Sequence, residues 1–256
     1  MPVLEKINAH KRDANIVFDE GPHTYTLNGS HIKFTSVTTL VHHQFEQFDA
    51  ERILDNIFKK NPLPEKYQGK TRESLKAEWE DNRNQAATAG TELHQNIEDY
   101  FNGRDIDNKS VEWQYFMQFH TDNLNLKPYR TEWVVYDEDI ELAGSIDMVT
   151  ENEDGTLTIY DWKRSREIAK TSNFNKFSTN PQIEHIPDSN FWHYSLQLNI
   201  YKAVLERKYS KRIKELFLVC LHPNQKNYQL LKCPNLQNEV QQLFDKRQNP
   251  KVIRQD

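Results

Sequence analysis

Two neighbouring strand-like segments that carry carboxylates at matching positions constrain the fold more than any other feature of the sequence. Leu142–Thr150 and Leu157–Lys163 are rich in β-branched and aromatic residues, and the Asn-Glu-Asp-Gly sequence at 152–155 is typical of a tight turn. Paired positions in an antiparallel hairpin have numbers with a constant sum, so Asp147 should lie opposite Asp161. We therefore predict a hairpin in which two carboxylates face each other on one side of a sheet.

The charges on this face of the hairpin require compensation. Asp161 and Lys163 are two residues apart, so both side chains project from the same face of the strand. Facing carboxylates repel each other, and Lys163 supplies one positive charge against two negative ones. A divalent cation would balance these charges, and paired oxygen ligands suit Mg²⁺ or Mn²⁺. The alternative is an exposed hairpin with scattered charges, but both strands also carry large apolar residues that indicate burial: Ile146, Met148, Val149, Ile159, Tyr160 and Trp162.

A helix before the hairpin offers a further ligand. The segment Ala86–Phe101 predicts a helix because apolar residues recur every four positions along it. His94 and Glu98 are four residues apart and therefore project from nearly the same face. Neutral imidazole is a good ligand for a transition metal, but a single histidine beside an apolar stripe is more often a core residue with its hydrogen bonds satisfied. The residues alone favour the second interpretation.

The remaining segments predict an α/β fold. Residues 16–41 predict a β-hairpin with its turn at Asn28-Gly29, a pair that strongly favours hairpin turns. Residues 43–81 predict short helices interrupted at 61–64, which form an excursion from the core such as a lid or an arch. Further helices are expected at 111–124, at 192–207 and from 235, and further strands at 132–136, 216–221 and 228–232. We divide the chain into residues 1–82, the hairpin and excursion, and residues 83–256, a core with a central mixed β-sheet flanked by helices.

The composition narrows the class of protein. A net charge of −5 does not indicate a protein that coats nucleic acid through bulk charge, although Arg164 and Arg166 belong to a local basic stretch. The two cysteines, Cys220 and Cys233, form no CxxC pair, which argues against a cysteine-built zinc or iron–sulfur site and fits a reducing compartment. The first residues lack an apolar signal region, and no apolar run is long enough to span a bilayer. We expect an intracellular protein without membrane attachment.

Four short motifs, in order along the chain, resemble those of the RecB-like branch of the PD-(D/E)xK nuclease superfamily. Gly90–Glu98 resembles the GxxxHxxxE motif, and Gly144–Asp147 resembles the G-x-x-D motif. Asp161-Trp162-Lys163 resembles the D-x-K motif, and Gln197–Tyr201 resembles the QxxxY helix. Each motif is weak by itself, but chance would rarely place all four in this order. The resemblance implies a restriction-endonuclease-like core, of the phage, viral or organellar type without an iron–sulfur cluster.

The resemblance also implies roles for individual residues. In relatives, the equivalents of His94, Asp147, Asp161 and the backbone carbonyl of Trp162 bind one or two Mg²⁺ or Mn²⁺ ions. The equivalent of Lys163 orients or deprotonates the attacking water and stabilises charge on the phosphorane. Glu98 is then expected beside these ligands or on a second ion. Gln197, Tyr201, Arg164 and Arg166 are expected to contact the substrate.

The activity implied by the resemblance is phosphodiester hydrolysis in DNA. We expect an exonuclease that acts on single- or double-stranded ends in recombination, repair or replication, with a recombinase, a single-strand-binding protein or a helicase as a partner. The expected location is the cytoplasm of a bacterium or of a phage- or virus-infected cell, or an organelle. Three alternatives stay open from the sequence: an endonuclease, an RNA-directed nuclease of the same fold, and a catalytically inert nucleic-acid-binding module.

Overall fold

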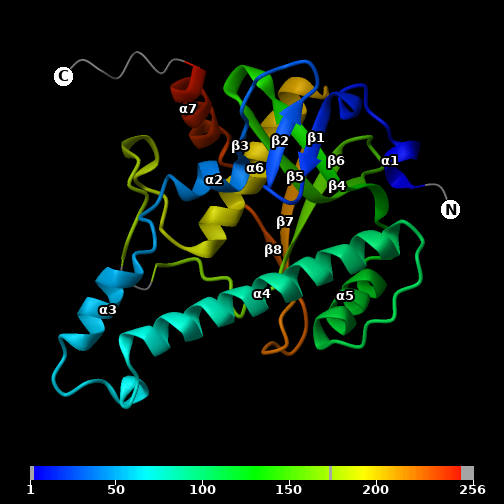
Figure 1. The fold of residues 1–256 in the computed structure, drawn as a ribbon. Helices are drawn as coiled ribbons and strands as arrows, with labels where there is room; N and C mark the ends of the chain where they lie inside the picture. The colour runs from blue at the N-terminus through cyan, green and yellow to red at the C-terminus, as the bar shows by residue number, and fades with distance from the viewer. Residues whose placement is uncertain (1–2, 173–174, 249–256) are drawn as a thin grey trace.

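A six-stranded mixed β-sheet forms the centre of the computed structural model, which describes residues 3–172 and 175–248 (Figure 1). The order is β3-β5-β6-β7-β8, and β4 pairs with β5. The strands are β3 (Thr35–Ser36), β4 (Lys127–Asp137), β5 (Leu142–Glu151), β6 (Leu157–Lys163), β7 (Ile213–Cys220) and β8 (Gln229–Lys232). Because β3 pairs with β5 and β6 pairs with β7 in parallel, while the other pairs are antiparallel, the predicted mixed sheet is confirmed.

Helices cover both faces of this sheet, and the alternation of side chains along each strand explains why. Tyr160 packs with α4 (Arg72–Phe101) and α5 (Val111–Asp122), whereas its neighbour Ile159 belongs to the larger core cluster on the opposite face. That second face is covered by α2 (Val37–His42), α6 (Asn190–Lys208) and α7 (Gln237–Gln248). No helix within the described residues is both long and apolar enough to cross a membrane.

The N-terminal hairpin exists, but the position that we predicted for its turn is wrong. The hairpin consists of β1 (Ile16–Asp19) and β2 (Thr24–Leu27), so its turn lies at residues 20–23. Asn28 instead holds the open end of the hairpin, because its backbone N–H donates to the Asn15 carbonyl at 2.8 Å. Residues after Gly29 form no third antiparallel strand; they lead to β3, which pairs with β5 at the edge of the main sheet. A turn does form at Asn28-Gly29, where the Ser30 backbone N–H donates to the Leu27 carbonyl at 3.0 Å, but it leads the chain to β3 instead of joining two antiparallel strands.

The excursion is helical, as predicted, but its last helix is much longer than expected. After α3 (Ala50–Phe58), the helix α4 begins at Arg72 rather than at Ala86, behind a capping box formed by Thr71 and Ser74. The helix then continues without a break to Phe101. The division of the chain that we placed between residues 82 and 83 falls inside this helix, and no change of secondary structure marks it.

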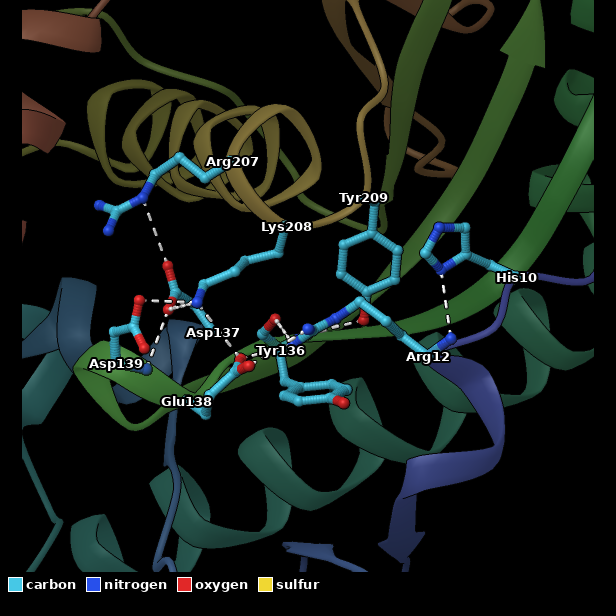
Figure 2. A network of polar contacts seen from close by, with 9 residues as sticks. All are labelled: His10, Arg12, Tyr136, Asp137, Glu138, Asp139, Arg207, Lys208 and Tyr209. Atoms are coloured by element: carbon cyan, nitrogen blue, oxygen red, sulfur yellow. Dashed lines mark hydrogen bonds and ion pairs between the residues drawn. The ribbon is translucent and has the colours of Figure 1, made fainter.

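A network of charged and aromatic groups ties the N-terminal segment after α1 (Leu4–Ile7) to the end of β4 (Figure 2). The guanidinium of Arg12 lies 4.0 Å from the ring centroid of Tyr136 and 5.2 Å from that of Tyr209. It also forms an ion pair with Glu138 at 2.5 Å, and the backbone N–H of Tyr136 donates to the Tyr209 hydroxyl. Burial would raise the pKa of Glu138, but the hydrogen bonds from Arg12 outweigh it and lower the pKa to about 2.

The C-terminal end of α6 completes this network. Asp137 is fully buried and faces Arg207 at 3.4 Å and Lys208 at 3.3 Å, and Lys208 also bonds to Asp139 at 2.7 Å. Arg207 and Lys208, in the last turn of α6, therefore hold the turn between β4 and β5. A buried carboxylate requires such partners because an unpaired buried charge is strongly destabilising.

Arg12→Ala should lower the free energy of unfolding by about 2 kcal/mol at neutral pH, between the values for exposed and buried ion pairs. The folded-state pKa of Glu138 is depressed, so its contribution is present above the unfolded value of 4.5 and is lost as the pH falls towards about 2. The difference between wild type and Arg12→Ala in urea titrations should therefore shrink over that pH range. A constant difference would contradict the ion-pair explanation, and Lys6→Ala serves as a control for loss of an N-terminal charge.

Candidate active site

The two carboxylates of the predicted hairpin lie where β5 and β6 separate. The pairs Met148↔Tyr160 and Val149↔Ile159 have the predicted register, and the ladder ends at Met148↔Tyr160. Asp147 and Asp161 would form the next pair beyond the end of the ladder. Instead of continuing the ladder, the backbone N–H of Trp162 donates to Asp147 Oδ2 at 2.8 Å. The carboxylate of Asp147 therefore occupies the gap that opens between the strands.

Asp161 and Lys163 project from the same face of β6, as predicted. Lys163 Nζ lies 2.7 Å from Asp161 Oδ2, and Asp161 is only 2% exposed. The ammonium also lies 4.7 Å from the ring centroid of Tyr194 on α6, in a cation–π arrangement. Tyr194 therefore helps to position Lys163, a role that the sequence did not indicate.

His94 reaches the same point from α4. Its Nε2 atom lies 2.9 Å from the backbone carbonyl oxygen of Trp162, and its Nδ1 atom lies 3.6 Å from Asp147 Oδ2. Nδ1 is equally close, at 3.6 Å, to an oxygen of Glu132 on β4. The interpretation of His94 as an ordinary core residue is therefore less suitable than its interpretation as a site residue. The carbonyl of Trp162, expected as a metal ligand, accepts a hydrogen bond from His94.

Glu132 is a further residue of the site that sequence reasoning missed. One atom from each of His94, Glu132 and Asp147 lies within 4.8 Å of the other two, a group of donor atoms that could hold a metal ion. The signal that could have found Glu132 was present: a single carboxylate inside the apolar stretch Thr131–Tyr136, the same criterion that singled out Asp161. Its pairing partner was missing from the prediction because the contact between β4 and β5 was not foreseen.

Burial and neighbouring charges shift the pKa values of the site residues. Burial would lower the pKa of His94, but the neighbouring carboxylates of Asp147 and Glu132 outweigh it and raise the pKa to about 9. Burial is the main reason that the pKa of Asp147 is raised and that the pKa of Asp161 is raised to about 6. Burial opposes the ammonium form of Lys163, but Asp161 and Asp147 outweigh it and raise its pKa. Lys163 is therefore an ammonium in this arrangement.

Other predicted residues lie at varying distances from this centre. Gln197 donates to the Tyr201 hydroxyl at 3.4 Å, and both side chains are buried below Asp147 and Asp161 rather than exposed to solvent. Arg164 is committed to an ion pair with Glu112 at 2.7 Å. Arg166 is exposed. Glu98 lines the same cavity as His94 and Glu132 but does not belong to the group of three donor atoms.

Gly144 explains how the G-x-x-D segment fits beneath Asp147. A Cβ atom at this position would lie 2.8 Å from the Tyr201 hydroxyl oxygen and 3.2 Å from Val37 Cγ2. The buried ring of Tyr201 therefore packs directly on the β5 backbone. This contact sets the position of β5, and hence of Asp147, relative to α6.

The donor set suits a divalent metal ion. The partly buried carboxylates of Asp147 and Glu132 and the imidazole of His94 converge, and the buried Asp161 is already balanced by Lys163. Oxygen-rich sites with one imidazole are typical of Mg²⁺, Mn²⁺ and related ions. The side chains that would hold such an ion are His94, Asp147 and Glu132, with Asp161 beside them.

Comparison with known proteins identifies the family. A sequence model of the PD-(D/E)XK nuclease superfamily matches residues 30–255, so the chain belongs to this superfamily. No curated protein matches the chain. The crystal structure of SSO0001 aligns with a TM-score of 0.35 and 14% identity, covering 88% of this chain and 79% of that one. A structure from Eubacterium rectale, described as a candidate exonuclease, aligns with a TM-score of 0.29 and 13% identity, covering 60% of this chain and 73% of that one.

Gly144→Ala should lower the free energy of unfolding by about 2 kcal/mol, because a buried overpacked contact at 2.8 Å requires the Tyr201 ring or the strand to move. Gly90→Ala is the matched control. A Cβ at Gly90 meets nothing within 4 Å, and alanine in a helix interior is favoured over glycine by about 0.5–1 kcal/mol. Urea unfolding of both variants checks the signs, and an equal effect of the two substitutions would contradict the role of Tyr201.

Proposed function

We propose that this protein is a divalent-metal-dependent deoxyribonuclease that acts as an exonuclease at DNA ends. Membership of the nuclease superfamily supports phosphodiester hydrolysis. The observation that carries the proposal is the meeting of His94, Asp147 and the Asp161–Lys163 ion pair at the point where β5 and β6 separate. This arrangement offers acidic ligands for a cation on one side and a fixed ammonium group on the other.

The residues divide the tasks of hydrolysis between them. A bound divalent ion would supply positive charge to the phosphate and would acidify water. Asp147 and His94 would hold that ion, while Asp161 keeps the ammonium of Lys163 at a fixed place. Lys163 orients the attacking water and stabilises the negative charge that develops as the new oxygen–phosphorus bond forms and the bond to the leaving sugar oxygen breaks. Tyr194 limits the movement of Lys163 during this step.

The preference for ends draws support from the excursion, which is joined to the core at both of its ends. Near its start, Glu46 forms an ion pair with Lys176, and the Gln44 side chain accepts a hydrogen bond from Asn180 at 2.7 Å. At its other end, α4 carries His94 into the site. A DNA strand that has to pass this segment on its way to the metal ligands enters most easily from a free end.

The excursion also offers aromatic and basic groups to a single strand. Phe48 is 73% exposed and lies 6.0 Å from Trp79, ring centroid to ring centroid, beside a cavity of about 410 Å³ that Lys76 and Arg83 also line. Aromatic rings that solvent can reach, beside cations, are typical of sites that stack bases and contact phosphates; here Lys76 and Arg83 each also form an exposed ion pair, with Glu51 and with Glu80. Arg83 precedes His94 by eleven residues, close to three helical turns, so both project from one face of α4. We propose that this face leads the strand to the site.

Lys163→Met should reduce DNA cleavage at least about 100-fold while DNA binding persists, because the substitution removes the charge that stabilises the transition state but keeps the length of the side chain. Release of label from DNA with Mg²⁺ or Mn²⁺, and its loss with a chelator, is the measurement. Lys214→Met, which removes a surface lysine paired with Asp154, is the control and should cleave at the wild-type rate. Cleavage by Lys163→Met at the wild-type rate would refute the mechanism.

Closed circular DNA should resist the enzyme while linear DNA of the same sequence is degraded, because the proposal requires a free end. End-labelled linear, circular and single-stranded substrates incubated side by side provide the test. Rapid cutting of closed circles would overturn the exonuclease assignment and favour an endonuclease.

Trp79→Ala should raise KM for long single strands with little change in kcat, since Trp79 lies about 22 Å from His94 along the helix.

A further inference from the structure

We propose that Glu132 is a ligand of the catalytic cation, together with Asp147 and Nδ1 of His94, and that a strained backbone at Glu132 aims its carboxylate into the site. The inference deepens the proposed function and rests on it. The four sequence motifs of the chain do not include this residue. It comes from β4, a strand that contributes no other group to the site.

The backbone at Glu132 is unusual for a position inside a strand. The pairs Thr131↔Met148 and Trp133↔Ile146 place Glu132 beside Asp147 in the eleven-residue strand β4. Its φ of 42° lies in the left-handed region, which a residue with a side chain adopts only at an energetic cost. Glycine would take this conformation without penalty, so a glutamate at this position points to a use for the side chain.

The hydrogen bonds of Glu132 leave one carboxylate oxygen directed at the site. Ser145 donates from its hydroxyl to Glu132 Oε2 at 2.9 Å, and Oε1 lies 3.6 Å from His94 Nδ1. Within residues 3–172 and 175–248, no lysine or arginine forms an ion pair with Glu132 or with Asp147. Lys163 is engaged with Asp161, so Glu132 and Asp147 together leave two negative charges without a lysine or arginine partner.

The orientation of His94 indicates what these charges face. The Trp162 carbonyl can only accept a hydrogen bond, so the Nε2 atom of His94, at 2.9 Å, must carry the hydrogen. In neutral imidazole the lone pair then lies on Nδ1, which points towards two carboxylate oxygens at 3.6 Å. Three electron-pair donors that converge in this way repel one another unless a cation, or a proton on Nδ1, lies between them. A histidine that ligates through one nitrogen and donates to a carbonyl through the other is the usual arrangement at metal sites.

The dimensions agree with this assignment. Neighbouring ligands of an octahedral ion with bonds of about 2.1 Å lie about 3 Å apart. One ligand atom from each of His94, Glu132 and Asp147 lies within 4.8 Å of the other two. Side-chain movements of up to about one ångström would bring these three atoms to the spacing that an octahedral ion requires. The adjoining cavity of about 530 Å³, which His94 and Glu132 line, provides access for the ion and for water.

The first test measures binding of Mn²⁺ alone to the full chain, by electron paramagnetic resonance of the free ion or by calorimetry. Glu132→Gln should weaken Mn²⁺ binding at least tenfold. Glu141→Gln is the control, because Glu141 is an exposed carboxylate that also has a positive φ, 50°, but lies at the turn between β4 and β5. Its Mn²⁺ affinity should equal that of the wild type. Unchanged Mn²⁺ affinity in Glu132→Gln would overturn the inference.

The second test measures thermal unfolding in a chelator and with Mn²⁺. In Glu132→Gln, the rise in melting temperature that Mn²⁺ gives should be smaller than in the wild type. Glu132→Gly and Glu141→Gly both relieve backbone strain and should both stabilise the chelated protein, but only Glu132→Gly should lose Mn²⁺ affinity. If Glu132 only pairs with a protonated His94 and does not bind the ion, Glu132→Gln keeps the full Mn²⁺ response, which overturns the inference.

These results separate the inference from the proposed function. A wild-type protein that binds no Mn²⁺ and shows no metal-dependent cleavage would remove the proposed function itself. A wild-type protein that binds Mn²⁺ through a site that Glu132→Gln leaves intact would remove only the role of Glu132. Circular dichroism of each variant in chelator establishes that it is folded before its affinity is compared.

Discussion

Trp162 is the residue on which the site depends, through its backbone. Its N–H donates to Asp147 at 2.8 Å and its carbonyl accepts from His94 at 2.9 Å, so one residue positions ligands from β5 and from α4. Its side chain is directed to the other face of the sheet and contacts Phe116 and Phe119 of α5 edge to face. Because β6 remains paired with β7 through Asp161↔Leu218, this strand is held firmly while its other edge is free for chemistry.

The same arrangement makes the site costly for folding. The carboxylate of Asp161 is buried and that of Asp147 is largely buried, with 10% of the side chain exposed, and burial favours their neutral forms. Lys163 offsets one of these charges, while the other depends on groups outside β6. Away from the site, the charge of the buried Asp137, the last residue of β4, is balanced by Arg207 and Lys208 from α6. Asp161 and Asp137 are thus paired with lysine or arginine side chains, whereas Asp147 faces the imidazole of His94.

Local sequence information was sufficient for the parts of the site that lie close together along the chain. The turn at 152–155 fixes the register of β5 and β6, so the adjacency of Asp147 and Asp161 followed from counting. Glu132 could not be found in this way, because its position depends on the pairing of β4 with β5 and on a backbone conformation that no residue pattern encodes. The turn at Asn28-Gly29 forms, but it was wrongly predicted to join two antiparallel strands, because the parallel pairing of β3 with β5 is a long-range contact.

The start of α4 was missed for a different reason, and that reason bears on function. Residues 81–88 are all exposed, so no apolar stripe marks this part of the helix, and periodicity, the usual signal, is absent. A helix exposed on all sides gains little from packing and is held mainly by the propensity of its residues, its capping box and ion pairs such as Lys70–Glu78. Gly90 continues this open surface to the cavity beside His94, where a Cβ would meet nothing within 4 Å. Packing within the chain therefore does not require the small residues at 86–90, whereas Gly144 is small because Tyr201 leaves no space. The two motif glycines thus differ: packing against Tyr201 requires Gly144, whereas Gly90 lies on an open surface where packing does not require a glycine.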